Sequence, residues 1–404
     1  MNVIIKPSVA IGEINAPPSK SCAHRLLICA ALSKGKSVID NIGFNEDIIA
    51  TISCLKELGA CVEIANNKAT IYGIENKDRK EHINLFCNES GSTLRFLIPL
   101  SLLFSKTASF SGSQRLLERP QSVYEELFSE MGCYLKKGEK ALEAGGELKS
   151  GTYKIRGDVS SQFLTGLLFA LPLLDGESEI ILTTPLQSAP YIDITIDVLS
   201  QFGVKINKTD KGFYIKGNQK YIPQSTSVEG DWSNSAFLDA FNLIGGNVKV
   251  NGMNEESYQG DKVYRKFFSE LKNGTPTIDI TDCPDLGPIL ISCAVLCNGA
   301  RLIGTKRLKI KESDRGVAMQ SELSKFGVDV IVKEDEIIIP QAEIKAPKEN
   351  LYCHNDHRIA MSLAILCSKV GGTLENAQCV KKSYPEFFDN IKTLGIQIEV
   401  KGEK

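Results

Sequence analysis

The hydrophobic and polar positions of this 404-residue chain follow one pattern that recurs along the sequence. An apolar pattern of helical period ends at a glycine, which is predicted to cap the helix in the left-handed conformation, and short stretches of alternating apolar and polar residues follow it. The ending recurs at spacings of roughly 50–75 residues, which is the scale of a repeat architecture. The six glycines that close these patterns are Gly59, Gly132, Gly203, Gly274, Gly327 and Gly395.

Each copy also contains an earlier helix pattern that is apolar on nearly every face, for example at residues 163–174 and 289–297. One copy therefore reads as a βαβαββ unit, with its apolar helices buried and its amphipathic strands facing outward. We predict an α/β protein of two similar globular domains, each of three βαβαββ repeats, of the inside-out α/β barrel type.

Two stretches that contain proline, which interrupts helices and strands, predict where the chain passes between these domains. Pro17 and Pro18 follow the first strand pair, and the polar stretch 220–227 lies between the third and fourth copies. The predicted domains are residues 16–228 and residues 1–15 together with 229–404. We expect the active site in the cleft between the domains, which would close on a substrate.

Composition and charge narrow the class of protein. The chain is 42% hydrophobic and 24% charged, which is ordinary for a globular protein, and its net charge of -2 provides no overall attraction for nucleic acid or membranes. No apolar run approaches the ~18 residues of a membrane span. The twelve cysteines are scattered without a CxxC pair and the four histidines lack zinc-site spacing, so we expect a cytoplasmic protein without a metal.

The most charged candidate stretch is residues 309–315, with the sequence KIKESDR. Lys311, Asp314 and Arg315 stand at i, i+3 and i+4, so on a helix they would share one face, while Glu312 would point elsewhere. A solvated helix face is the ordinary alternative. Cations with a separately directed carboxylate suit an anionic substrate that also needs a proton moved, and we expect Asp314 to orient a neighbouring cation.

Other candidate residues lie where a polar cluster precedes an apolar helix. Helix N-termini attract anions through their N–H groups and dipole, although N-capping or a salt-bridged turn is the simpler alternative at each position. Eight cations are expected to converge, which predicts substrates carrying phosphate and carboxylate. These cations are Lys20, Arg25, Arg95, Arg119, Lys311, Arg315, Arg358 and Lys382.

The motifs PPSKSCAHR, SGSTLR, LLERP, SSQF, SAPY, CPDLGP, KIKESDR, NDHRIAM and KKSYP occur in the order found in 5-enolpyruvylshikimate-3-phosphate synthases. The chain resembles this family from about Pro17 to Pro385. The resemblance implies transfer of the enolpyruvyl group of phosphoenolpyruvate to the 5-hydroxyl of shikimate 3-phosphate, releasing phosphate, in chorismate biosynthesis. It also implies two domains of three βαβαββ units, no metal or organic cofactor, and a cytoplasmic monomer whose partners are these small molecules, not nucleic acid or membranes.

The resemblance also implies roles for individual residues. Shikimate 3-phosphate would be held by Lys20, Ser21, Arg25, Ser160, Ser161, Gln162, Ser188, Tyr191, Asp285 and Lys311. Phosphoenolpyruvate would be held by Lys20, Gly91, Arg119, Gln162, Arg315, His357, Arg358 and Lys382. The resemblance implies that Asp285 is the base that takes the 5-hydroxyl proton and that Glu312 is the acid that protonates the methylene carbon. Lys20 or His357 could share these proton transfers. Gly91 carries no methyl group, so we expect glyphosate, a competitor at the phosphoenolpyruvate site of this family, to fit.

Two other functions are compatible with such a fold. The sister enzyme that transfers enolpyruvyl to a UDP-sugar usually carries a reactive cysteine on a mobile loop of its first domain, and residues 96–118 contain no cysteine. A non-catalytic anion-binding protein is the second alternative. Asp285 and Glu312, placed among cations, count against it, because carboxylates would weaken a pure anion trap.

Overall fold

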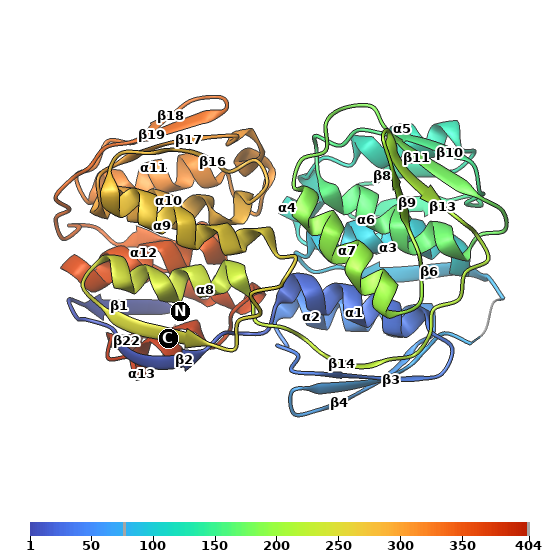
Figure 1. Ribbon diagram of the computed structural model, residues 1–404, viewed down its shortest axis with the longest axis horizontal. Coiled ribbons are helices and arrows are strands. Elements are labelled where there is room, and N and C mark those ends of the chain that lie inside the picture. Colours follow the sequence, from blue (N-terminus) through green and yellow to red (C-terminus); the bar gives the residue numbers. More distant parts are fainter. Residues whose placement is uncertain (76–77, 402–404) are drawn as a thin grey trace. The chain divides into compact units, whose positions relative to one another are not determined.

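The computed structural model describes residues 1–75 and 78–401, and these form two compact units. One unit is Pro18–Glu229, coloured blue to green in Figure 1, and the other combines Met1–Pro17 with Gly230–Lys404. None of the helices in the described ranges is long and apolar enough to cross a membrane.

The unit of residues 18–229 contains three four-stranded sheets with one pairing scheme. In each sheet the first strand runs parallel to the second, and the remaining contacts are antiparallel. The first sheet has the order β14 (Ser225–Ser227), β3 (Lys36–Asp40), β5 (Lys68–Tyr72), β4 (Cys61–Ala65). The second has the order β6 (Lys80–Phe86), β7 (Ser105–Ser111), β9 (Leu142–Gly145), β8 (Tyr134–Lys137). The third has the order β10 (Thr152–Ile155), β11 (Ser178–Leu182), β13 (Gly212–Ile215), β12 (Asn207–Thr209).

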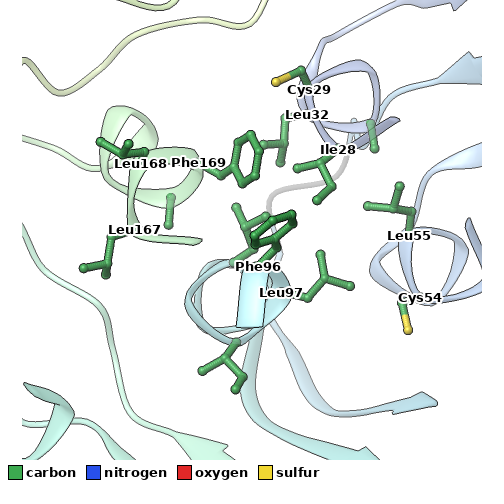
Figure 2. Packing of buried hydrophobic residues seen from close by; sticks show 14 of the residues in the cluster. Ile28, Cys29, Leu32, Cys54, Leu55, Phe96, Leu97, Leu167, Leu168 and Phe169 are labelled. Carbon is green, nitrogen blue, oxygen red and sulfur yellow. The ribbon is translucent and has the colours of Figure 1, made fainter. Parts of the chain in front are cut away.

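Apolar helices fill the interior of this unit, as Figure 1 shows. They are α1 (Lys20–Leu32), α2 (Glu46–Leu58), α3 (Gly91–Phe104), α6 (Ser161–Ala170) and α7 (Ala189–Gln201), while α4 (Gln114–Glu118) and α5 (Ser122–Glu130) follow β7. Figure 2 shows the centre of this core, where Phe96 of α3 lies near Phe169 of α6 beside Ile28 and Leu32 of α1. The two phenylalanine rings meet edge to face with centroids 5.7 Å apart. Nearly all residues of α1, α3 and α6 are buried, so chiefly the ends of these three helices are available for chemistry.

The second unit repeats the scheme, and the N-terminal strands complete it. One sheet has the order β16 (Thr277–Asp279), β17 (Ala300–Ile303), β19 (Glu336–Ile339), β18 (Ile331–Val332). Another has the order β20 (Leu351–Tyr352), β21 (Gly372–Glu375), β1 (Asn2–Lys6), β22 (Gln397–Lys401), and β15 (Asn247–Asn251) pairs in parallel with β2 (Ile11–Asn15). The helices are α8 (Trp232–Asp239), α9 (Tyr264–Asn273), α10 (Gly287–Leu296), α11 (Arg315–Lys325), α12 (His357–Val370) and α13 (Phe387–Thr393). The mixed α/β fold of repeating βαβ units in two domains is as predicted, and across the described residues the sheets do not close into a barrel.

The predicted glycine C-caps are confirmed at all positions but one. Gly59, Gly132, Gly203, Gly327 and Gly395 have positive φ angles between 74° and 117°. Gly274 instead has φ 168° and is extended, so the prediction of a left-handed cap is wrong there. The strand that follows Gly274, β16, pairs in parallel with β17, whereas the strands after the other five glycines pair antiparallel with their neighbours, so the chain enters its sheet differently here.

Candidate functional site

Serine N-caps fix three helix starts in the unit of residues 18–229. Ser19, Ser90 and Ser160 precede α1, α3 and α6, and each side chain accepts a hydrogen bond from a backbone N–H of the first turn. Lys20, Gly91 and Ser161 are consequently the first residues of these helices. Ser188 precedes α7 in a left-handed conformation, with φ 56°. Lys20, Gly91, Ser160, Ser161 and Ser188 therefore lie at helix N-termini, whose dipoles favour anions.

Arg25 ties α1 to α7. Its Nε donates to Thr195 Oγ1 at 2.8 Å, Nη2 donates to the carbonyl oxygen of Tyr191 at 3.0 Å, and Nη1 donates to that of Ser21 at 2.7 Å. Burial lowers the pKa of the Arg25 guanidinium to about 10. The bonds bring Ser21, Arg25 and Tyr191 together, as expected for one binding site. Thr195 was not predicted, because a threonine within a helical pattern carries no distinctive signal.

Gln162 links α6 to the start of α3. Its Oε1 accepts from Arg95 Nη1 at 2.8 Å, and its Nε2 donates to Ser92 Oγ at 3.0 Å. Arg95 also donates to the carbonyl oxygen of Pro120, and its guanidinium lies 4.7 Å from the ring centre of Phe163. Arg95 is buried, so this cation serves to orient the Gln162 amide.

Gly91 and Arg119 are in close contact. A Cβ atom at Gly91 would lie 2.7 Å from Arg119 Nη1, too near for an unmoved guanidinium. Arg119 was expected at a helix start, and this is wrong: it follows α4, and α5 begins at Ser122. The reason is Pro120, which disfavours helical geometry in the residue before it. Arg119 is accordingly extended, with φ -64° and ψ 142°.

Lys20 pairs with a residue that was not predicted. Its Nζ lies 2.8 Å from Asp47 Oδ2, in the first turn of α2, and both side chains are largely buried. Acidic residues are common in the first turn of helices, so Asp47 carried no signal of its own. The carboxylate orients the Lys20 ammonium group at the N-terminus of α1.

Arg315 is the centre of the second cluster, in the other unit. Its guanidinium contacts three carboxylates: Asp356 from Nε, Asp285 from Nη1 and Glu312 from Nη2, each at 2.9 Å. Burial alone would lower the pKa of Arg315, but the carboxylates outweigh it and raise the pKa above its ordinary value. Arg315 thus stays charged although its side chain is only 1% exposed.

The predicted geometry of residues 311–315 is wrong in two respects. Lys311 and Asp314 do not share a helix face with Arg315, because α11 begins only at Arg315 and residues 311–314, after the 3₁₀ helix η5 (Lys306–Ile310), are not helical. Glu312, expected to point elsewhere, folds back onto Arg315. Asp314 caps the helix by accepting from the backbone N–H of Val317, and the carboxylate that orients the cation is Asp356.

Asp285 lies among cations. It belongs to the 3₁₀ helix η4 (Pro284–Leu286) before α10. Its Oδ1 is 3.0 Å from Lys311 Nζ and 2.9 Å from Arg315 Nη1, and its Oδ2 is 3.7 Å from Arg358 Nη2. Burial would raise the pKa of the Asp285 carboxyl, but the three positive charges together hold it well below its ordinary value. The pKa of Lys311 is lowered, mainly by burial.

The start of α12 brings further predicted residues to this cluster. His357 and Arg358 are its first two residues, and Asp356 is the N-cap, accepting from the backbone N–H of Arg358 at 2.9 Å. Lys382 donates from Nζ to the carbonyl oxygen of Asn355 at 2.5 Å. Lys382 ends the 3₁₀ helix η6 (Ala377–Lys382), so it is not at a helix start.

Asp261 is a further acidic residue that sequence reasoning missed. It is buried in the 3₁₀ helix η3 (Gly260–Val263), and its Oδ2 accepts from the hydroxyl of Ser233 in α8. Burial raises the pKa of the Asp261 carboxyl to about 7, and the negative charge of Asp285 adds to this effect. Among residues 1–75 and 78–401, no group of three or more His, Cys, Asp or Glu side chains is arranged to hold a metal ion.

Known proteins match the chain along almost its whole length. The family model described as EPSP synthase (3-phosphoshikimate 1-carboxyvinyltransferase) matches residues 5–391. The chain belongs to the EPSP synthase family. Relatives named 3-phosphoshikimate 1-carboxyvinyltransferase include one from Clostridium kluyveri, 44% identical with 98% of each chain covered. One from Clostridium botulinum strain Eklund 17B is 42% identical, covering 97% of this chain and 96% of the relative.

A solved EPSP synthase from Acinetobacter baumannii has the same fold. Its TM-score is 0.78 at 22% sequence identity, and the match covers 99% of this chain and all of the other. The family resemblance, the fold class and the enzyme class predicted from the sequence are therefore confirmed, and the chain is an alkyl transferase of the EPSP synthase type.

Proposed function

We propose that this EPSP synthase transfers the carboxyvinyl group of phosphoenolpyruvate to the 5-hydroxyl of shikimate 3-phosphate through the two side-chain clusters described above. The observation that carries the proposal is Asp285, a half-buried carboxylate held against Lys311, Arg315 and Arg358. A site that only binds anions gains nothing from that carboxylate, whereas a site that moves protons needs a general acid or base, and a carboxylate can fill this role.

Shikimate 3-phosphate is assigned mainly to the cluster of residues 18–229. Hydroxyl and amide donors at the starts of α1, α6 and α7 suit its phosphate and ring hydroxyls, and Arg25 supplies a fixed charge. The proposed ligands are Lys20, Ser21, Arg25, Ser160, Ser161, Gln162, Ser188 and Tyr191, with Lys311 and Asp285 from the other unit.

Phosphoenolpyruvate is assigned to the remaining cations. The side-chain-free position at Gly91 leaves Arg119 beside the backbone at the start of α3, where a small anion could bind both. The proposed ligands are Lys20, Gly91, Arg119, Gln162, Arg315, His357, Arg358 and Lys382. Several guanidinium and ammonium groups are required, because the phosphate leaves with its negative charge.

The proposed chemistry is an addition followed by an elimination. Glu312 protonates the methylene carbon of phosphoenolpyruvate, the 5-oxygen bonds to its C2, and Asp285 accepts the hydroxyl proton. The C2–O bond to phosphate then breaks, Glu312 takes back a proton of the new methyl group so that the double bond is restored, and Asp285 returns its proton to the departing phosphate. Asp285 alone is a poor base, since its pKa is held low. Anionic substrates beside the three cations offset their field and raise the pKa of Asp285 toward the range where it accepts a proton.

Phosphate release separates this function from its alternatives. Purified protein is mixed with phosphoenolpyruvate and either shikimate 3-phosphate or UDP-N-acetylglucosamine. We expect release only with shikimate 3-phosphate. Phosphate release with UDP-N-acetylglucosamine but not with shikimate 3-phosphate would favour the sister enzyme. The absence of phosphate release in both mixtures would favour a non-catalytic anion-binding protein. Either result would overturn the proposal.

We also propose a cytoplasmic monomer that works without a metal, organic cofactor, nucleic acid or membrane partner. All twelve cysteines are free and ten are buried, which suits a reducing compartment. The predicted domains, residues 16–228 and residues 1–15 with 229–404, are proposed to close on the substrates. This last proposal rests on the sequence repeat, and small-angle scattering should show compaction when shikimate 3-phosphate and glyphosate are added.

A further inference from the structure

A left-handed turn precedes α12. His354 and Asn355 have φ angles of 51° and 52°, and the backbone N–H of Asp356 donates to the carbonyl oxygen of Cys353 at 2.9 Å to close the turn. Two successive left-handed residues that are not glycine are uncommon and persist where neighbouring groups hold them. The turn therefore needs an external support.

The turn carries three of the contacts in the Arg315 cluster. Asp356, directly after it, binds Arg315 and caps α12 at the N–H of Arg358. The carbonyl oxygen of Asn355, within it, accepts from Lys382 Nζ. A change in the backbone of this turn would consequently move the partners of Arg315, Arg358 and Lys382 together.

Glu322 supplies the support from α11. Its Oε1 accepts from His354 Nε2 at 2.9 Å, and its Oε2 accepts from the backbone N–H of Tyr352 at 2.9 Å and from Lys325 Nζ at 2.8 Å. Glu322 is buried and stands seven positions after Arg315, so both residues lie on the same face of α11. Burial would raise the pKa of Glu322, but these three partners lower it below its ordinary value, which keeps the carboxylate charged.

We propose that Glu322 and His354 are positioning residues for phosphoenolpyruvate. Their hydrogen bond holds the left-handed turn, and the turn sets the positions of Asp356, Asn355 and Arg358 around the substrate's anionic groups. The inference rests on the proposed assignment of Arg315, Arg358 and Lys382 to phosphoenolpyruvate. Neither Glu322 nor His354 is proposed to touch the substrate.

Two substitutions test the contact while sparing the backbone. Asparagine tolerates left-handed geometry, so His354→Asn keeps the turn accessible but removes the ring that reaches Glu322. Glu322→Ala removes the acceptor, and Glu322→Gln is the conservative variant that keeps one. We expect His354→Asn and Glu322→Ala to raise KM for phosphoenolpyruvate by about tenfold, which corresponds to the loss of roughly one hydrogen bond to a charged group. Glu322→Gln should raise it less, and KM for shikimate 3-phosphate should change by less than about twofold.

A double variant and a matched control distinguish positioning from general stability. Because the two residues act through one contact, Glu322→Ala combined with His354→Asn should raise KM no further than the larger single change. Asn66 is also left-handed, with φ 53°, in the turn between β4 and β5 of the other unit. Asn66→Ala and His354→Ala both place alanine in a left-handed position, yet only His354→Ala should raise KM for phosphoenolpyruvate.

The proposal is overturned if folded His354→Asn and Glu322→Ala proteins keep the wild-type KM for phosphoenolpyruvate. It is also overturned if KM rises equally for both substrates. Arg358→Lys separates this failure from that of the proposed site. If Arg358→Lys raises KM for phosphoenolpyruvate while the turn variants do not, the positioning role alone is wrong. If Arg358→Lys leaves KM unchanged, the assignment of the site is wrong.

Discussion

Arg315 and Asp356 form an ion pair that is closed to solvent. Nε of Arg315 lies 2.9 Å from Oδ2 of Asp356, and the side chains are 1% and 0% exposed. Removing one charge from a buried pair leaves the other uncompensated, which is strongly destabilising. Asp285 and Glu312 also contact Arg315, so the loss of Asp356 is partly offset.

We expect Asp356→Asn to lower the free energy of unfolding by about 3 kcal/mol, the lower end of the range for a broken buried pair. Asparagine keeps an oxygen for the N-cap of α12, so the effect reports the charge. Urea denaturation measures it. The control is Asp40→Asn, which breaks an exposed pair with Lys68 and should cost less than about 1 kcal/mol. If Asp356→Asn and Asp40→Asn lose the same free energy of unfolding, the buried ion pair contributes no more to stability than the exposed one.

Asp285→Asn and Glu312→Gln should each reduce kcat by at least about 100-fold while retaining substrate binding, because general acid–base catalysis supplies a factor of this order. Steady-state kinetics and calorimetric titration of shikimate 3-phosphate measure the two quantities. Glu334→Gln, which removes an exposed carboxylate near Lys306, should leave both unchanged. Full activity in either variant would remove that residue from its proposed catalytic role.

Gly91→Ala should weaken the binding of phosphoenolpyruvate and of glyphosate by about tenfold, since the new methyl group displaces the Arg119 guanidinium from one charge-assisted contact. KM and the inhibition constant report the change. Gly274→Ala is the matched control, because Gly274 is extended and a Cβ there meets no heavy atom within 4 Å. If KM for phosphoenolpyruvate and the inhibition constant of glyphosate are unchanged in Gly91→Ala, the Arg119 guanidinium can move aside without loss of binding. If glyphosate inhibits the wild type only at millimolar concentration, the expected fit of glyphosate is wrong.

Asp261 should make stability depend on pH. Its folded-state pKa of about 7 lies above the ordinary 3.8, so between these values the folded protein holds a proton that the unfolded chain has released. Stability therefore falls as pH rises through this window, by at most about 4 kcal/mol. Asp261→Asn should remove this loss, so its gain in stability over the wild type should be larger at pH 8 than at pH 5 in urea denaturation. The same difference at both pH values would contradict the raised pKa.

Local patterns determined the architecture of this chain. Helical periods, glycines such as Gly59 and serines such as Ser90 act within a few residues of their own positions, so they identify helix ends and repeats without any knowledge of distant contacts. Gly274 shows the limit of this reasoning, because it is extended although it ends the same kind of helical pattern as the other five glycines.

The sequence also placed Lys20, Arg315 and Arg358 at helix starts, but only the tertiary structure decided their partners. Lys20 pairs with Asp47, 27 positions away, and Arg315 with Asp356, 41 positions away. Glu312 turned toward Arg315 because the backbone before α11 is not helical. Which carboxylate meets which cation depends on how buried elements pack and on the energetic requirement to pair buried charges, and neither is encoded in spacing along the chain.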